Sequence, residues 1–123
     1  KRPYQTSPSG VPGVETMLPL LLDSVNHGQL TLQDVVRACS SEPARILKIP
    51  QKGALQVGFD ADVVVVDMAH VATVGQRRLF SKCGWSPFEG RELKGWPVMT
   101  FVSGKLVFDN GRIDGSIRGK DVF

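Results

Sequence analysis

The order of apolar and polar positions changes character near Pro50. Before that residue, apolar side chains recur with the spacing of helices, and after it they alternate or form short continuous runs. We therefore expect residues 1–49 to form a loop followed by helices, and residues 50–123 to form strands. Three helices and a few strands make no obvious single small fold, so the two parts are expected to belong to different hydrophobic cores.

The first helix is expected over Val14 to Val25, where apolar residues lie on nearly every side. Pro19 restricts where this helix can begin, because proline lacks an N–H and fits only in the first turn. With Thr16 as the N-cap, Pro19 would be the third helical residue. Gly28 follows the helix and is expected to cap its C-terminal end.

Two further helices are expected before Pro50. Thr31 and Asp34 have the spacing of a capping box in a weaker form, which predicts a helix starting at Thr31. Ser41, Glu42 and Pro43 predict a restart, with a serine cap, an acid at the positive helix end and a proline in the first turn.

The second part of the chain has a strand pattern. A buried strand is expected from Ala61 to Asp67, and a hairpin is expected from Val98–Val102 and Lys105–Phe108. Ser103-Gly104 would form the hairpin turn, and Asp109-Asn110-Gly111 would close it.

Residues 69–97 are expected to form a long irregular loop, which in a compact domain is usually functional or packed against another part. Within it, the motif SKCGWSPFEG places Trp85 and Phe88 beside Pro87. Aromatic side chains of that size in a loop predict that it is anchored to the body of the protein.

Composition narrows the class of protein. The chain has 123 residues, 41% of them apolar and 22% charged, with a net charge of +3, which is typical of one globular domain. No basic run alternates with aromatics, which argues against nucleic-acid binding, and no apolar run reaches the about 20 residues of a membrane span.

The first residues lack a Met, and we expect this sequence to be the middle of a longer chain. Cys39 and Cys83 are expected as free thiols in the cytoplasm, with one disulfide between them as the alternative.

Residues with catalytic or metal-binding chemistry are sparse and scattered. His27 is expected at a helix C-terminus and His70 in solvent, and neither has a partner at metal-ligand spacing. Asp60 and Asp62 flank a strand start, where turn formation is their expected role. The glycine-rich stretch SPSGVPGVET has two interpretations: a tight connector, which composition favours, or a loop whose backbone approaches a ligand.

Five motifs together resemble one family. SPSGVPGVETMLPLLL, SSEPARIL, GFDADVVVVD, FSKCGWSPFEGRELKG and FVSGKLVFDNG look, in this order, like the C-terminal third of a dihydroorotase. The third motif is general to the amidohydrolase superfamily. The P-x-G-x-P-G-x-E-T and S-K-x-x-W-S-P-F-E-G patterns are specific to dihydroorotases and their close non-catalytic relatives.

The resemblance implies an α/β fold, in which this chain supplies the last helical part of a (β/α)8 barrel and C-terminal strands of a small β-sandwich domain. Residues 1–49 would hold a substrate loop, the last barrel helix (Leu18 to Val25) and linking helices. Residues 50–123 would complete the β domain, with a long loop at 69–97. The complete enzyme would use zinc to interconvert N-carbamoyl-L-aspartate and L-dihydroorotate.

The resemblance also assigns the site residues. The zinc ligands and the catalytic aspartate of the family precede Lys1, so no catalytic or metal residue is expected in this segment. The backbone of Pro8, Ser9 and Gly10 corresponds to the loop that hydrogen-bonds the dihydroorotate ring. The expected partners are a small-molecule substrate and the N-terminal barrel portion of the same enzyme.

Other functions stay open at this stage. The chain could belong to a non-catalytic dihydroorotase-like subunit that is a structural partner of aspartate transcarbamoylase, or to a homo-oligomer of the enzyme. It could belong to another cyclic-amide hydrolase, such as an allantoinase or dihydropyrimidinase, or be an independent small binding domain. A D-H-x-P-H motif directly before Lys1 would separate enzyme from non-catalytic relative.

Overall fold

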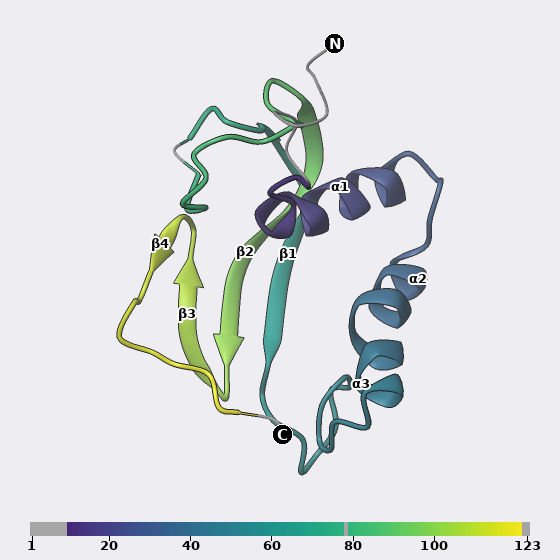
Figure 1. Ribbon diagram of the computed structural model, residues 1–123. Coiled ribbons are helices and arrows are strands. Elements are labelled where there is room, and N and C mark those ends of the chain that lie inside the picture. Colours follow the sequence, from purple (N-terminus) through teal and green to yellow (C-terminus); the bar gives the residue numbers. More distant parts are fainter. Residues whose placement is uncertain (1–9, 78, 122–123) are drawn as a thin grey trace.

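The computed structural model describes residues 10–77 and 79–121 and has helices first and strands second, as expected. The elements are α1 (Val14–Asn26), α2 (Leu32–Val36), η2 (Arg37–Ser41), α3 (Glu42–Ile46), β1 (Val63–Thr73), β2 (Glu92–Val102), β3 (Lys105–Asp109) and β4 (Arg112–Ile113). The four strands form one antiparallel sheet in sequence order. Figure 1 shows α1 crossing β1 and β2, while α2, η2 and α3 form an arm set to one side.

Helix α1 begins earlier than predicted. Its N-cap is Gly13, whose carbonyl oxygen accepts hydrogen bonds from the backbone N–H groups of Thr16 (3.2 Å) and Met17 (2.9 Å). The prediction of Thr16 as N-cap is therefore wrong: its side chain is buried inside the first turn. Pro19 consequently lies in the helix interior, where it leaves the carbonyl of Glu15 without its usual i+4 donor. Its ring is fully buried, so packing offsets that loss.

The C-terminal end of α1 confirms the glycine cap. His27 is the C-cap residue of α1. Gly28 follows with φ of 70°, a left-handed conformation that glycine adopts without strain. The N–H of Gly28 donates to the Val25 carbonyl (3.0 Å) and that of Gln29 to the Ser24 carbonyl (2.9 Å). This pair of bonds is the Schellman motif.

The arm is one continuous helical stretch with a wide turn in the middle. The capping box at Thr31 and Asp34 is confirmed in both directions. The predicted third helix is confirmed, since α3 begins at Glu42 with Ser41 at the N-cap position and Pro43 in the first turn, but Ser41 has helical dihedral angles and makes no side-chain cap. Instead, the Glu42 N–H donates to the carbonyl of Arg37, the i−5 bond of a π-turn. Pro43 lacks the N–H for a regular ladder, and the wide turn directly before it accommodates that gap.

The sheet extends into the region expected to be irregular. β1 continues to Thr73 and β2 begins at Glu92, so the irregular segment is 74–91 instead of 69–97. The predicted hairpin is confirmed, with positive φ at Ser103 (49°) and Gly104 (75°), as in a type I′ turn. The turn at 109–111 does not close the sheet, as it leads into the unpredicted strand β4.

Two irregularities bend the β1–β2 ladder. Asp67 pairs with Trp96 and Val71 pairs with Lys94, so residues 68–70 lie opposite Gly95 alone. The Asp67 Oδ1 organises this bulge by accepting the N–H groups of Ala69 (2.8 Å) and His70 (3.1 Å). Figure 1 shows the two strands curving where α1 crosses them.

A proline marks the other irregularity. The register shifts between Val65 and Val66, where β2 carries Pro97. Pairing of β2 with β3 begins only at Met99, so Pro97 lies where β2 has a neighbour on one side. A proline without an N–H is tolerated at such a bulge.

Burial is concentrated where α1 meets the sheet. Leu22 of α1 and Leu93 of β2 are completely buried, whereas Val64 and Val65 of β1 are 45% and 41% exposed. The prediction of a buried strand from Ala61 is therefore not met in this structure. None of the helices in the described residues is long and apolar enough to cross a membrane.

Candidate functional site

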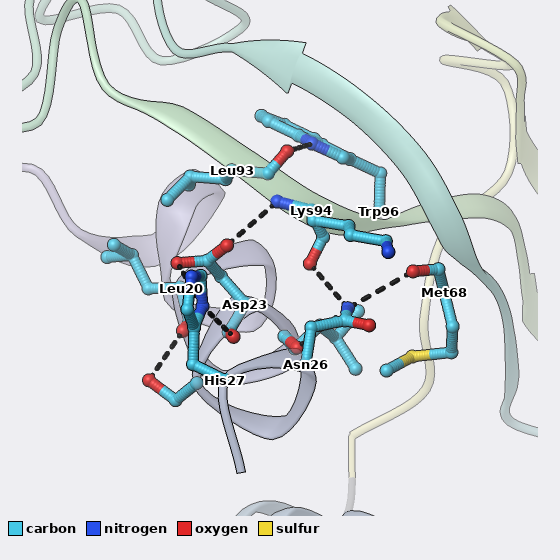
Figure 2. A network of polar contacts seen from close by, with 10 residues as sticks. Leu20, Asp23, Asn26, His27, Met68, Leu93, Lys94 and Trp96 are labelled. Carbon is cyan, nitrogen blue, oxygen red and sulfur yellow. Dashed lines mark hydrogen bonds and ion pairs between the residues drawn. The ribbon is translucent and has the colours of Figure 1, made fainter. Parts of the chain in front are cut away.

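The junction between α1 and β2 is held by two polar side chains of α1, shown in Figure 2. The Asp23 Oδ1 accepts the backbone N–H of Lys94 (2.9 Å), and the Asn26 Nδ2 donates to the carbonyl oxygen of Lys94 (2.8 Å). The same amide nitrogen donates to the carbonyl of Met68 in the bulge (3.1 Å). Both backbone groups of Lys94 thus find partners on the helix, which docks α1 onto the bulge.

Gly95 makes the close approach of α1 possible. Its φ is 105°, and a Cβ atom at this position would lie 2.7 Å from the Cβ of Leu22 and 3.2 Å from the Asn26 Nδ2. Any side chain would therefore push the helix off the sheet. Next to it, the Trp96 Nε1 donates to the Leu93 carbonyl (2.9 Å), which fixes the indole ring along the strand.

The opposite end of α1 contacts the segment 74–91. The Glu15 carboxylate accepts two backbone N–H groups, that of Phe80 at Oε1 (3.2 Å) and that of Ser81 at Oε2 (3.0 Å). Glu15 belongs to the P-x-G-x-P-G-x-E-T pattern, and Phe80 and Ser81 open the FSKCGWSPFEG stretch. The two patterns that carry the resemblance therefore meet in space. Glu15 stands in a pattern that is visible in the sequence, but its role appears only from this contact.

Segment 74–91 is closed at its base and packed along its length. The N–H of Val74 donates to the Arg91 carbonyl, and the N–H of Gly90 donates to the Val74 carbonyl, both at 2.9 Å. The ring of Phe80 meets that of Phe108 on β3 edge-on, with centroids 6.4 Å apart. The segment is thus tied to α1 and to the sheet.

The predicted aromatic anchors have a smaller part in this packing. Phe88 is half-buried, with the Arg91 guanidinium 5.9 Å from its ring centroid, but Trp85 is 38% exposed. Ser86 is the buried residue of this stretch, and its Oγ accepts the N–H of Phe88 (3.2 Å). Trp85 is thus only partly covered, and its anchoring of the segment stays a prediction.

A hollow of about 610 Å³ lies on the same segment. It is lined by residues 79–82 with Gly75, Gly84 and Glu89. Its charged side chains are Lys82 and Glu89, and both residues are exposed. Such groups can contact a polar molecule, but they lack the burial that prepares a side chain for acid–base catalysis.

The predicted substrate-binding residues are only partly covered by the structure. Pro8 and Ser9 lie outside the described residues. Gly10 is exposed, and a Cβ atom added to it would meet nothing within 4 Å. Its backbone is therefore open to a ligand, and the N-cap of α1, Gly13, lies three residues further on.

The remaining candidate residues have structural surroundings. The His27 Nδ1 lies 2.8 Å from the Asp23 carbonyl oxygen at the helix end, and His70 is exposed, both as expected. Cys39 and Cys83 are exposed free thiols. Within residues 10–77 and 79–121, no three His, Cys, Asp or Glu side chains gather in a way that could hold a metal ion.

Asp60 and Asp62 form an ion-pair cluster with Lys52 at the start of β1. The Lys52 Nζ is 2.9 Å from Asp60 Oδ2 and also pairs with Asp62. The hydrogen bond from Lys52, followed by that from the Ser103 N–H, lowers the pKa of the Asp62 carboxyl below its usual value. This cluster ties the strand start to the hairpin turn, which extends the turn-forming role that was expected.

Residues 9–107 match the Amidohydrolase family, and the chain belongs to it. The relatives named dihydroorotase include the protein of Pyrococcus furiosus, 42% identical over 114 residues, which are 93% of this chain and 27% of the relative. That of Methanosphaera stadtmanae is 39% identical over 82% of this chain and 24% of the relative. The chain thus spans about a quarter of the length of these relatives.

Solved structures with the same fold include proteins named hydantoinase or dihydropyrimidinase. The L-hydantoinase (dihydropyrimidinase) from Arthrobacter aurescens superposes with a TM-score of 0.81 at 40% identity, covering 85% of this chain and 24% of that one. The D-hydantoinase from Thermus sp. gives 0.78 at 31% identity, covering 91% and 25%. An inactive dihydroorotase-like domain from Chaetomium thermophilum gives 0.69 at 24% identity, covering 95% and 31%, and shows the shared fold alone.

Proposed function

We propose that this chain is the C-terminal portion of a dihydroorotase, which interconverts N-carbamoyl-L-aspartate and L-dihydroorotate. The observation that carries the proposal is the 42% identity to a dihydroorotase over 93% of the chain. It is supported by the contact of Glu15 with Phe80 and Ser81, which joins the two patterns specific to the resemblance. In the hydrolytic direction, water adds across the ring C–N amide bond, giving a carboxylate and an open-chain urea.

In this proposal α1 is the last helix of the barrel, and the sheet belongs to the small β domain beside it. Exposed apolar side chains on α1 and on the arm support the idea that another part of the enzyme covers them. Met17 on α1 is 52% exposed, and Ile46 and Leu47 on the arm are 64% and 55% exposed. Since these side chains are about half exposed, covering them with the N-terminal barrel portion would contribute roughly 1–2 kcal/mol each.

Zinc would be held elsewhere in the complete enzyme. The described residues of this chain do not fit a zinc site, because they offer no cluster of suitable ligands. When bound, the metal would supply an activated water and polarise the amide carbonyl. We expect the isolated chain to bind no stoichiometric zinc and to hydrolyse no dihydroorotate, which elemental analysis and a turnover assay would check.

The part of this chain closest to the reaction would be the backbone at Pro8, Ser9 and Gly10. Backbone groups there would hydrogen-bond the substrate ring, so the side chain of residue 9 should matter little. We expect Ser9→Ala to leave kcat/KM within about threefold, and Gly10→Val to lower it about 5- to 150-fold, the cost of one or two lost hydrogen bonds. Full activity in Gly10→Val would mean that the loop is only a connector, and a larger defect in Ser9→Ala than in Gly10→Val would contradict binding through the backbone.

A second candidate is a hydantoinase or dihydropyrimidinase. The observation that favours it is the L-hydantoinase superposition at 40% identity, similar to the identity with dihydroorotases. Both reactions open a cyclic amide, and they differ in whether the ring carries a carboxylate. A substrate panel therefore separates them.

The deciding experiment assays the complete zinc-loaded protein with L-dihydroorotate, dihydrouracil and hydantoin. We expect kcat/KM for L-dihydroorotate to exceed that for the other two by at least about 100-fold, because a site built for a substrate carboxylate discriminates strongly against its absence. A preference for hydantoin or dihydrouracil would establish the second candidate. If the protein has none of the three activities but forms a complex with aspartate transcarbamoylase, the result would instead support the hypothesis of a non-catalytic subunit.

A further inference from the structure

The Glu15 contact invites an explanation beyond helix stability. An acid in the first turn of a helix is stabilised by the helix dipole and needs no partner. Glu15, however, accepts two N–H groups from residues 65 and 66 positions away in the sequence. Each carboxylate oxygen takes one of them, at 3.2 and 3.0 Å. The contact therefore fixes the first turn of α1 against segment 74–91.

The first turn of α1 also holds the end of the glycine-rich loop in position. Gly13 ends that loop and is bound to the turn through the N–H groups of Thr16 and Met17. Gly10 lies three residues before Gly13, and around its Cβ position no atom lies within 4 Å. Within the described residues, the position of Gly10 thus depends on its covalent link to a turn that Glu15 holds in place.

We propose that Glu15 is a positioning residue for substrate binding: it clamps the start of α1 to Phe80 and Ser81 and so sets where the backbone at Gly10 meets the substrate. This inference rests on the proposed function, in which that backbone contacts the ring of the cyclic amide. Phe80 and Ser81 then contribute to substrate binding through their contact with Glu15. A displacement of about 1 Å at a contact of this kind can cost about 100-fold in rate.

Residue 15 must be a carboxylate to accept both N–H groups, because each of its two oxygens takes one of them. Glutamine offers one accepting oxygen, and its NH₂ group would face one of the two N–H groups. Glu15→Gln should therefore retain one hydrogen bond and Glu15→Ala none. The expected order of function is wild type, then Gln, then Ala.

Asp23 provides a matched control. It lies on the same helix, and its carboxylate also accepts a backbone N–H from a distant segment, that of Lys94 at 2.9 Å. It lies near the other end of α1, away from the glycine-rich loop. Asp23→Ala should therefore loosen α1 against the sheet without displacing Gly10.

The test uses the complete enzyme and separates KM from kcat. We expect Glu15→Ala to lower kcat/KM for L-dihydroorotate about 10- to 100-fold, mainly by raising KM, and Glu15→Gln to fall between it and wild type. Asp23→Ala should stay within about threefold of wild type in KM, since it is distant from the loop. A purely structural role would lower the active fraction and leave KM unchanged. Unchanged KM in Glu15→Ala, or an equal rise in Asp23→Ala, would overturn the proposal.

A second readout does not depend on activity. Hydrogen exchange of the peptides containing Phe80–Ser81 and Thr16–Met17 should become about tenfold faster or more in Glu15→Ala, and in Asp23→Ala only the Lys94 peptide should do so. Unchanged exchange at residues 80–81 would overturn the clamp. If wild type hydrolyses no cyclic amide, the proposed function fails, and the exchange result alone then decides whether Glu15 positions the loop.

Discussion

The α1–β2 junction and the α2–α3 arm both carry apolar side chains, yet the arm, apart from the buried Val35, leaves its large apolar side chains exposed. At the junction, Leu22 and Leu93 are fully buried, whereas Ile46 and Leu47 on the arm are more than half exposed. The arm contacts chiefly itself and the end of α1. Figure 1 shows it standing apart from the sheet.

The difference teaches that apolar content alone does not create a core. The junction is buried because Asp23 and Asn26 satisfy the backbone of Lys94, and because Gly95 lets the helix approach closely. The arm buries Val35 and packs closely around Gly53, but its side chains Ile46 and Leu47 stay exposed among the described residues. In the proposed function, its partner surface lies in the rest of the enzyme.

The largest expected difference in stability is between truncating a side chain at the junction and truncating one on the arm. Leu22→Ala should lower the free energy of unfolding by about 2–5 kcal/mol, because it leaves a cavity in a fully buried site. Ile46→Ala in the isolated chain should change it by less than about 0.5 kcal/mol. Urea denaturation followed by circular dichroism measures both. Equal costs would erase the distinction, whereas a cost above about 1 kcal/mol for Ile46→Ala only in the complete protein would show that the arm is covered there.

The next effect tests the close approach at Gly95. Gly95→Ala should cost about 2–4 kcal/mol, the sum of left-handed strain and overpacking against Leu22. Gly28→Ala is the matched control, since Gly28 also has positive φ but open space around its Cβ position. It should cost only about 1–2 kcal/mol from strain. A thermal denaturation series of both variants isolates the crowding, and equal shifts would mean that Leu22 can move aside.

A smaller effect is expected from the polar side of the junction. Asn26→Ala removes the donor to the carbonyls of Lys94 and Met68 and should cost about 1–3 kcal/mol. Gln33→Ala on the exposed arm should stay within about 0.5 kcal/mol of wild type. The midpoints of urea unfolding compare the two. An unchanged free energy of unfolding in Asn26→Ala would mean that water replaces the side-chain amide as hydrogen-bond donor without cost.

The smallest effect concerns pH and the Lys52 cluster. The pKa of Asp62 is lowered in the folded state by Lys52 and Ser103, so its contribution is present above the unfolded pKa and is lost as pH falls through the folded value. Asp62→Asn keeps an accepting oxygen for the Ser103 N–H but removes the charge. We expect it to cost about 0.2–1 kcal/mol at pH 7, as for exposed ion pairs, and nothing once pH is well below 3.8. A pH-independent difference in unfolding free energy would contradict the assigned cause.

Local signals predicted the parts of the fold that local residues determine. The capping box at Thr31, the glycine cap at Gly28 and the Ser103-Gly104 turn depend on neighbours within a few positions, and all three are confirmed. The start of α1 was misplaced because proline was assumed to need the first turn. Complete burial of the Pro19 ring instead stabilises it inside the helix, and that burial depends on tertiary packing.

The candidate site was harder to predict, because its contacts join distant segments. The pattern containing Glu15 pointed to the glycine-rich loop, yet its contact with Phe80 and Ser81 is invisible in either stretch alone. The same holds for the bulge opposite Gly95. A glycine between Lys94 and Trp96 is a sequence signal for close backbone approach, but it does not name the helix that approaches.

The span between Asp23 and Lys94, 71 residues, also has a consequence for synthesis of the protein. At about 5–20 residues per second, a ribosome needs roughly 4–14 s to pass from one to the other. During that interval α1 has emerged or is emerging, while the strand that covers Leu22 does not yet exist. The face of α1 that carries Leu22 therefore lacks its covering strand for seconds, a period in which chaperones or neighbouring chains can bind that face before the sheet does.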